Sequence, residues 1–323
     1  MHQNNHSIEV SILIPTFNEQ SSIIQVINDA HKAMELTNYS YEILVVEDCS
    51  TDNTVEKLKD RNDIRLIQHK SNQGSGAARR TGIKEAKGEI VVMIDGDGTY
   101  PAKEIPELLK YLPEYDQVNG ARKEESGDLK IFRTPAKWFI KSLACFLTKE
   151  KIPDLNTGLK AFKRSIALKY IWALPDGFSC VSTLTLSFLC NGYSVKYIPI
   201  DYYPRKNSKS KFHPIKDTYS YMVTVIRMIS YFQPMKVFLP LSLFLFIFGV
   251  VKTLIDYQII QRMQLSDIVI FMASFIVFCL GVLADLIVAQ AKRIGGINEK
   301  IFKDLVTEIN QSKTQQEKEK VVR

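Results

Sequence analysis

Ile90-Val91-Val92-Met93-Ile94-Asp95-Gly96-Asp97-Gly98 joins an unbroken apolar run to two carboxylates with one glycine between them. The run is typical of a strand that is buried on both faces of a parallel sheet. Open α/β sheets bind ligands in the crevice at the carboxyl ends of their strands, where Asp95 and Asp97 would lie. Paired carboxylates suit Mg²⁺ or Mn²⁺, although such a pair can also do no more than close a turn.

Strand and helix patterns alternate around this stretch. Apolar runs predict strands at 10–14, 43–46, 65–68 and 90–94. Helical patterns lie between and after them, at 20–36, 54–59, 75–86 and 102–111. This alternation predicts an α/β fold with a doubly wound, mostly parallel sheet.

Polar residues follow each of the four predicted strands. They are Pro-Thr-Phe-Asn-Glu at 15–19, Glu-Asp-Cys-Ser-Thr-Asp at 47–52, the glycine-containing segment 72–80, and the acid pair. An acid at a strand end can hold a ribose, and a glycine turn that opens a helix lets backbone N–H groups approach a phosphate. Each motif alone is often only a turn or a cap, but four at one sheet edge indicate a nucleotide pocket.

The composition points to a membrane. The net charge is +7 and the isoelectric point is near 9.0, which suits either nucleic acid or an anionic membrane surface. The apolar excess follows Val237 and the basic residues concentrate around the apolar segments, so we expect no nucleic-acid partner. The five cysteines form no Cys-x-x-Cys pair, which argues against zinc and disulfides and favours reduced thiols in the cytoplasm.

Two apolar segments, at about 237–255 and 268–290, are long enough to cross a bilayer as helices. Lys236 precedes the pair, and Lys292 and Arg293 follow it. The positive-inside rule therefore predicts a multi-pass protein of the cytoplasmic (inner) membrane with both termini in the cytoplasm. Amphipathic helices near 135–148 and at 213–236 would lie in the headgroup plane, although the first could equally be a core helix.

With the motifs at 15–19, 47–52, 72–82 and 95–97, the chain resembles glycosyltransferase family 2, which has the GT-A fold. The resemblance covers about residues 8–125. More narrowly, it is similar to the polyprenyl-phosphate glycosyltransferases, a group that includes dolichyl-phosphate mannose synthase and bacterial undecaprenyl-phosphate sugar transferases. That likeness rests on Asp154-Leu155-Asn156-Thr157-Gly158-Leu159-Lys160-Ala161-Phe162, the basic segment 205–211 and the two spans. It implies transfer of a sugar from a UDP- or GDP-linked donor to a polyprenyl phosphate such as undecaprenyl phosphate, with inversion.

Site residues follow from the resemblance and from side-chain chemistry. Asp95, Asp97 and Asp154 are the catalytic candidates, and Asp95 and Asp97 would hold Mg²⁺ or Mn²⁺. Asp154 could instead only cap a turn. Arginine forks match phosphate oxygens, so Arg122, Arg205, Ser210 and Lys211 are candidates for the acceptor phosphate, although the basic run could also be a solvated or headgroup-binding face. The nucleotide-sugar candidates are Pro15, Thr16, Asn18, Glu19, Asp48, Gly76, Arg79, Asp95 and Gly96.

The sequence departs from the family pattern at three single positions and in the basic segment 205–211, which lacks the usual glycine. Thr99 stands where a glutamine often assists the metal, Glu47 replaces an aspartate, and Cys49 replaces a glycine. These changes bear on metal coordination and on the choice of nucleotide and sugar more than on the reaction class.

The predicted organisation is a catalytic domain at 1–212, with a nucleotide-sugar half at 8–125 and an acceptor half at 126–212. A juxtamembrane helix at 213–236, the spans within 237–291 and a polar tail at 292–323 follow it. Relatives of this type also suggest a possible homotetramer. A processive polysaccharide synthase is disfavoured, because neither Trp138 nor Trp172 follows an arginine as in Gln-x-x-Arg-Trp. A family 2 enzyme with a glycan or another lipid acceptor, and a non-catalytic membrane scaffold with a degenerate nucleotide fold, remain alternatives.

Overall fold

The computed structural model describes residues 8–123, 150–177, 179–204 and 233–290, and the single residues 145, 223 and 231. The chain forms two compact units, Met1–Met228 and Ile229–Arg323. The helix predicted near 135–148, most of the one at 213–236 and the tail at 292–323 lie outside the described residues.

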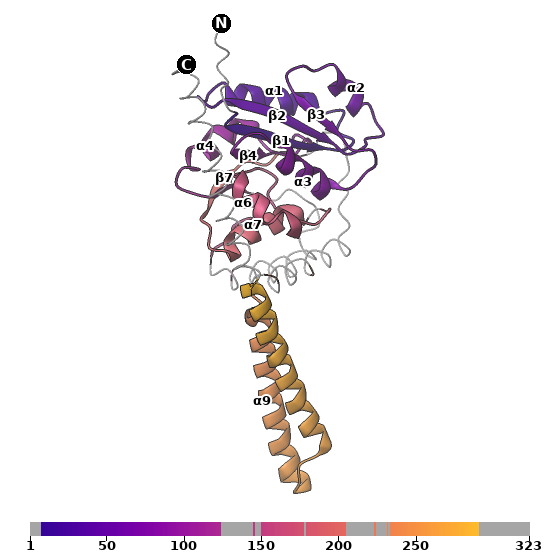
Figure 1. Cartoon of the computed structure of the whole chain (residues 1–323), viewed down its shortest axis with the longest axis vertical. Helices are drawn as coiled ribbons and strands as arrows, with labels where there is room; N and C mark the ends of the chain where they lie inside the picture. Colours follow the sequence, from indigo (N-terminus) through magenta and orange to yellow (C-terminus); the bar gives the residue numbers. More distant parts are fainter. Residues whose placement is uncertain are drawn as a thin grey trace, which may run out of the picture. The chain divides into compact units, whose positions relative to one another are not determined.

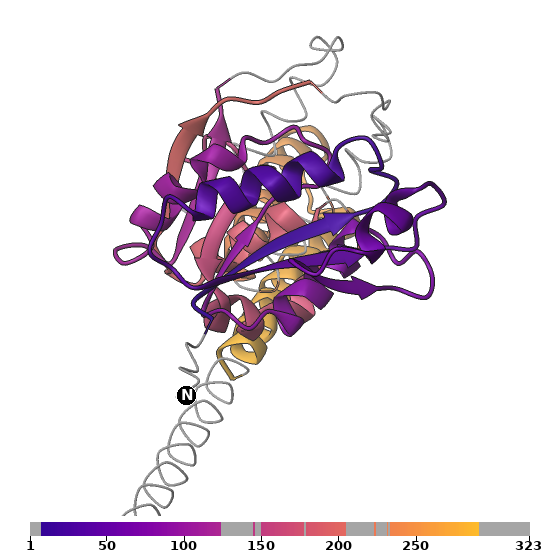
Figure 2. The same cartoon turned by 90° about the horizontal axis from the view of Figure 1, so that it is seen from above.

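The first unit is built on a seven-stranded sheet of order β3-β2-β1-β4-β6-β5-β7 (Figures 1 and 2). β6 is antiparallel to both of its neighbours, and the other neighbouring pairs are parallel. The expected mostly parallel sheet is therefore confirmed. The strands are β1 (Val10–Thr16), β2 (Tyr41–Glu47), β3 (Arg65–Gln68), β4 (Ile90–Met93), β5 (Gln117–Arg122), β6 (Lys160–Lys163) and β7 (Val195–Ile200).

Helices cover both faces of this sheet, as in a doubly wound fold. Alternate residues of β1 show the division, because Ile12 and Ile14 pack with α1 and α4, whereas Leu13 packs with α3, α6 and α7. Figure 1 shows α1 on one side of the sheet and α3, α6 and α7 on the other. The helices are α1 (Ile23–Met34), α2 (Thr54–Lys59), α3 (Ser75–Glu85), η1 (Ala102–Glu104), α4 (Ile105–Lys110), α6 (Arg164–Lys169), η2 (Ile171–Ala173) and α7 (Cys180–Cys190).

The eight elements predicted up to residue 111 are confirmed, with small differences at their ends. The helix expected from residue 20 begins at Ile23, because the preceding residues form a turn in which Ser22 N and Ile23 N donate to Glu19 O. The helix expected from residue 102 begins as the 3₁₀ turn η1. The later elements of this unit that the structure describes, from β5 to β7, had no prediction.

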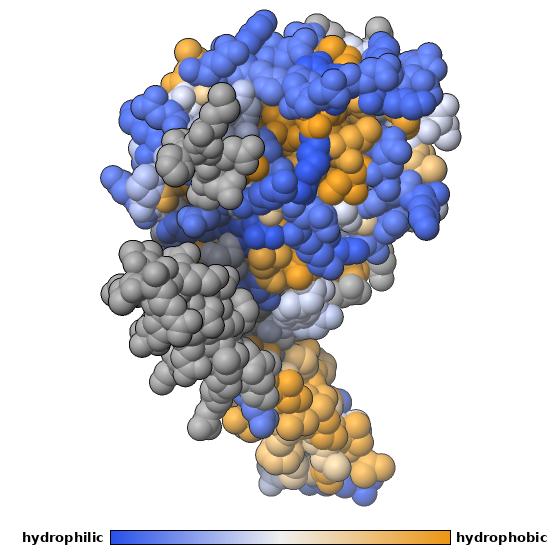
Figure 3. Space-filling model, turned by 45° about the horizontal axis from the view of Figure 1, so that its top comes forward, coloured by the Kyte–Doolittle hydropathy of each residue, from blue (hydrophilic) through white to orange (hydrophobic). Residues whose placement is uncertain are grey.

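The second unit contains two long apolar helices, α9 (Met235–Ile260) and Leu265–Gln290. Each is long and apolar enough to cross a membrane, and little of either is buried within the structure, unlike the core helix of a soluble protein. Figure 3 shows this largely apolar surface in orange. The helices pack through small residues, with Ser274 Oγ donating to Ser242 O at 2.8 Å and Gly249 lying against Phe271.

An ionic cluster joins the two helices near their connecting turn. Lys252 Nζ donates to Asp256 at 2.5 Å, to Ser266 at 2.8 Å and to Asp267 at 2.7 Å. The charge that interrupts the first apolar segment is therefore paired within the hairpin, as expected for an ionisable group among apolar helices.

Candidate active site

The two acids of the opening stretch lie in the turn after β4, residues 94–99, which we call the acid turn. Their surroundings differ. Asp95 has 24% of its side chain exposed, whereas Asp97 is buried. Thr99 donates to Asp97 Oδ1 through its hydroxyl at 2.7 Å and its backbone N–H at 3.1 Å. Thr99 therefore orients the carboxylate of Asp97.

Arg79 lies behind Asp95 and is almost fully buried. It projects from α3 and donates from NH2 to Asp95 Oδ1 at 2.6 Å, while NH1 donates to Ser75 O at 3.1 Å. The sequence suggested that Arg79 contacts the nucleotide sugar. In the structure its guanidinium holds one carboxylate of the acid turn in place, and its contact with the nucleotide sugar stays a prediction.

The segment before β6 packs directly on the acid turn. A Cβ atom added to Gly158 would collide with Asp95 Oδ2 and with the ring of Tyr100. Only glycine allows this close approach. The Asp154–Gly158 segment and the acid pair therefore lie in contact, and their common role in one site stays a prediction.

Asp154 forms a two-pronged ion pair with Arg122 at the end of β5. Arg122 Nε donates to Asp154 Oδ2 at 2.7 Å, and NH2 donates to Oδ1 at 2.9 Å. Burial would raise the pKa of Asp154, but hydrogen bonds from Arg122 and from the Asn156 N–H outweigh it and lower the pKa. Asp154 is thus a carboxylate at neutral pH, and it shares the guanidinium that was predicted to hold the acceptor phosphate.

Two tyrosines connect this ion pair with the acid turn. The Arg122 guanidinium lies 5.2 Å from the centre of the Tyr202 ring, which in turn meets Tyr100 edge-on at 5.2 Å. Tyr203 N also donates to Thr99 O at 2.9 Å. The residues that follow β7 therefore run along the acid turn just before they reach Arg205.

The loops after β1 and β2 are fastened to each other. Asn18 N donates to Ser50 Oγ at 2.9 Å, and Thr51 N donates to Asn18 Oδ1 at 2.8 Å. Glu19 N donates to Thr54 Oγ1 at 2.9 Å. The backbone and side chain of Asn18 and the backbone of Glu19 thus preorganise the predicted nucleotide pocket, and Glu19 is half-buried. Pro15 and Thr16 are buried at the end of β1.

Asp48 accepts hydrogen bonds from three sources. Its carboxylate accepts from Gln73 N at 3.0 Å and Gly74 N at 2.8 Å, and His69 Nδ1 lies 2.7 Å from Oδ1. The other ring nitrogen of His69 lies 2.9 Å from Thr81 Oγ1. His69 was missed by sequence reasoning, because a lone histidine at the end of a short strand carries no recognisable pattern.

The glycine turn before α3 faces another backbone segment. Gly76 N donates to Asp176 O at 2.6 Å and Ala77 N to the same oxygen at 3.3 Å, and a Cβ at Gly74 or Gly76 would collide with that segment. Arg80 also pairs with the Asp176 carboxylate. In this structure the small residues serve close chain packing, and the amide that was expected to meet a phosphate is occupied by a carbonyl oxygen.

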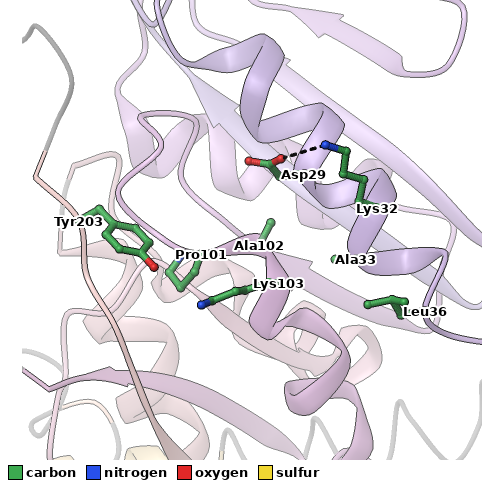
Figure 4. Close-up of a pocket in the computed structure, with 8 residues that line it drawn as sticks. All are labelled: Asp29, Lys32, Ala33, Leu36, Pro101, Ala102, Lys103 and Tyr203. Carbon is green, nitrogen blue, oxygen red and sulfur yellow. Dashed lines mark ion pairs between the residues drawn. The ribbon is translucent and has the colours of Figure 1, made fainter.

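Arg205, Ser210 and Lys211 lie outside the described residues. A hollow of about 320 Å³ lies between α1, η1 and Tyr203, and Figure 4 shows the residues that line it. None of the predicted site residues is among them. The hollow therefore does not include Asp95 or Asp97, although Tyr203, which lines it, bonds to Thr99 through the backbone.

The acid turn fits a hard divalent cation. Among the described residues, no cluster of three or more acidic, histidine or cysteine side chains could hold a metal by itself. Asp95 and Asp97 can supply two carboxylates, and Mg²⁺ and similar ions commonly take their remaining ligands from water and substrate phosphates. The donor set thus suits an ion that binds together with a diphosphate.

Two protein-family models match the chain. Glycosyl transferase family 2 matches residues 11–171, and the GtrB C-terminal hairpin matches residues 233–289. Glycosyltransferase AglJ from Haloferax volcanii is 29% identical over 305 residues, which cover 88% of this chain and 97% of that protein. Undecaprenyl-phosphate 4-deoxy-4-formamido-L-arabinose transferase from Yersinia pestis is 32% identical over 165 residues, 49% of this chain and 50% of that protein. The chain thus spans only about half of this second relative.

Solved structures support the same fold. The glucosyl-3-phosphoglycerate synthase from Mycobacterium tuberculosis, in complex with Mn²⁺, UDP-glucose and phosphoglyceric acid, superposes with a TM-score of 0.53. The match covers 68% of this chain and 79% of the synthase at 18% sequence identity. The expected GT-A architecture is confirmed, followed in the chain by the two apolar helices.

Proposed function

Because the chain belongs to glycosyl transferase family 2, we propose that it transfers a sugar from a nucleoside diphosphate sugar to a polyprenyl phosphate in the membrane. The observation that carries this proposal is the packing of Gly158 on Asp95. It joins the acid turn, which suits a diphosphate, to the Arg122–Asp154 pair, which suits a phosphate acceptor. The apolar hairpin and the relatives that act on undecaprenyl phosphate support a lipid acceptor.

The reaction would need little acid–base chemistry from the protein. A phosphate monoester is mostly ionised at neutral pH, so its oxygen can attack the anomeric carbon directly. The new bond joins that oxygen to the anomeric carbon, the bond to the diphosphate breaks, and the nucleoside diphosphate leaves, with inversion. The work of the chain is then positioning and charge neutralisation.

Individual residues would divide this work. Arg79 holds Asp95, and Thr99 holds Asp97, so that both carboxylates are preorganised for Mg²⁺ or Mn²⁺ and the donor diphosphate. When bound, the divalent ion would neutralise the negative charge of the diphosphate. Arg122, with Arg205, Ser210 and Lys211 of the basic segment, would hold the acceptor phosphate, and Asp154 would orient Arg122 or the donor sugar.

A direct test uses membranes that contain the full chain. They are incubated with undecaprenyl phosphate and radiolabelled UDP- or GDP-sugars, and the lipid is then extracted. We expect labelled lipid from one donor. We expect no labelled lipid in a control in which polyprenol replaces the polyprenyl phosphate. No labelled lipid from any donor would reject the acceptor class. Undiminished transfer by Asp97→Ala would reject the metal role of the acid turn.

A further inference from the structure

Lys160 is a fully buried lysine in the sheet beneath the candidate site. It begins β6, and none of its surface is exposed. Lysine is almost never fully buried unless it is paired with an acid. Among the described residues, however, Lys160 forms no ion pair. Its Nζ donates instead to Val181 O at 2.7 Å and to Thr185 Oγ1 at 2.9 Å, both on α7.

The polar groups around Lys160 form a small buried network. Thr185 Oγ1 also accepts from Gln117 Nε2 at 2.9 Å, and Gln117 donates to Asn119 Oδ1 at 2.7 Å. These contacts carry no negative charge that would offset a positive charge on Lys160. An apolar side chain of similar length, such as methionine, would avoid the burial of a charge at this position.

The position of Lys160 relates it to the site. Lys160 follows Gly158 by two residues, and in the sheet it pairs with Met93, two residues before Asp95. Burial lowers the pKa of Lys160 to about 7, and the charged or titratable groups around it are Asp154, Cys180, Arg79 and Asp95. A buried lysine whose pKa is lowered this far, next to a candidate site, is a recognised sign of a functional role.

We infer that Lys160 is a positioning residue for the donor: from behind the acid turn it takes up a proton from solvent when the negatively charged nucleoside diphosphate binds. The neutral amine then becomes an ammonium that offsets added negative charge and holds β6, and with it Gly158, against the acid turn. This inference rests on the proposed function, because it requires a diphosphate at Asp95 and Asp97.

The test compares three forms of the detergent-solubilised full chain: wild type, Lys160→Met and Lys163→Met. Lys163 lies on the same strand, is partly exposed and pairs with Asp116, so it is the matched control. Binding of UDP and of GDP, each with Mn²⁺, is measured by calorimetry at pH 6.5, 7.5 and 8.5. Titration of the nucleotide's own phosphate is common to all three forms and cancels in the comparison.

We expect wild-type affinity to fall above pH 7, by up to about 10-fold per pH unit, because binding takes up one proton. Lys163→Met should behave like the wild type. Lys160→Met should bind the nucleotides more weakly than wild type at pH 6.5, and its affinity should not show the fall above pH 7 that this lysine causes in the other two forms. Its Tm should rise by a few degrees because a buried charge is removed. A gain in Tm together with a loss of affinity is what a merely structural lysine would not give.

Three outcomes would overturn the inference. Equal affinity and equal pH dependence in Lys160→Met and wild type would show that the lysine does not act on the donor. A fall in Tm that accounts for the lost binding would make Lys160 purely structural. Binding of UDP or GDP without any proton uptake would reject this inference alone, whereas failure of both nucleotides to bind the wild type would reject the proposed donor as well.

Discussion

At the scale of single residues, the turn after β2 contains a strained backbone conformation. Cys49 adopts a left-handed backbone conformation, with φ of 61°, in the turn after β2. Its N–H donates to the carboxylate of the buried Glu47, as does Ser50 N at 2.6 Å. The acidic side chain of Glu47 thus closes the turn from below, and the strained residue completes it.

Replacing Cys49 with glycine should stabilise the protein slightly. A non-glycine residue in the left-handed region costs about 1–2 kcal/mol, and glycine loses about 0.5–1 kcal/mol through its greater freedom in the unfolded chain. The net gain is about 0.5 kcal/mol, seen as a small rise in Tm in detergent. Cys190→Gly, at the end of α7, should lower the Tm instead. A Tm below wild type for Cys49→Gly would show that its thiol packs productively.

The buried lysine also predicts how stability depends on pH. The pKa of Lys160 is lowered to about 7, so between pH 7 and about 10.5 the unfolded chain holds a proton that the folded chain lacks. Stability should therefore rise with pH over this window and gain nothing from this group below pH 7. The Tm advantage of Lys160→Met over wild type should accordingly shrink between pH 7 and pH 9. An advantage that grows with pH would contradict the sign of this shift.

At the scale of elements, the contact between the β6 approach and the acid turn is the most sensitive feature. Gly158→Ala would drive a methyl group into Asp95 and the ring of Tyr100. A displacement of about 1 Å at a reacting centre can reduce the rate by about 100-fold, so we expect a loss of that order. Sugar transfer and donor KM would be measured in membranes.

Gly177→Ala is the matched control for that experiment. Apart from its chain neighbours, no described residue has an atom within 4 Å of a Cβ added to Gly177, so transfer by this variant should stay close to wild type. Wild-type activity in Gly158→Ala would mean that the acid turn and the Asp154–Gly158 segment do not act as one site.

Some helices and strands could be predicted from their sequences and others could not. β1, β4 and α1 were predictable because short apolar runs and an apolar face repeat at the periods of strand and helix. α7 was not, because it is buried almost all round and lacks a polar stripe. β6 was not, because it is short and starts and ends with lysine.

The same limit applies to the site. Asp95, Asp97 and Asp154 were proposed from strand ends and motifs, and in the structure the Asp154–Gly158 segment packs on the acid turn. Their partners could not be identified, because the sequence cannot show that Arg79 and Arg122 face these carboxylates from other elements. Lys160 stood within a recognised motif, yet burial, which makes it unusual, emerges only from the fold.

At the scale of the whole molecule, the chain comprises one unit built on a sheet and one that contains two long apolar helices. The proposed orientation has both termini in the cytoplasm and the turn between α9 and Leu265–Gln290 outside. A single cysteine introduced as Gln261→Cys in a cysteine-free background should react with a membrane-impermeant maleimide in cells whose inner membrane is exposed but intact. Labelling only after the membrane is broken would reverse the proposed orientation.

The place of β6 in the sheet has a consequence for synthesis on the ribosome. β4 and β5 are not neighbours, because β6, made some forty residues after β5, is inserted between them. Until residue 163 leaves the ribosome, β4 is an open edge that could pair with another chain. Once β7 has been made, all seven strands of the sheet can pair before α9 is synthesised and directed to the membrane. Slow translation across residues 123–163 would therefore prolong the interval in which nascent chains can aggregate, whereas a pause after residue 200 would not.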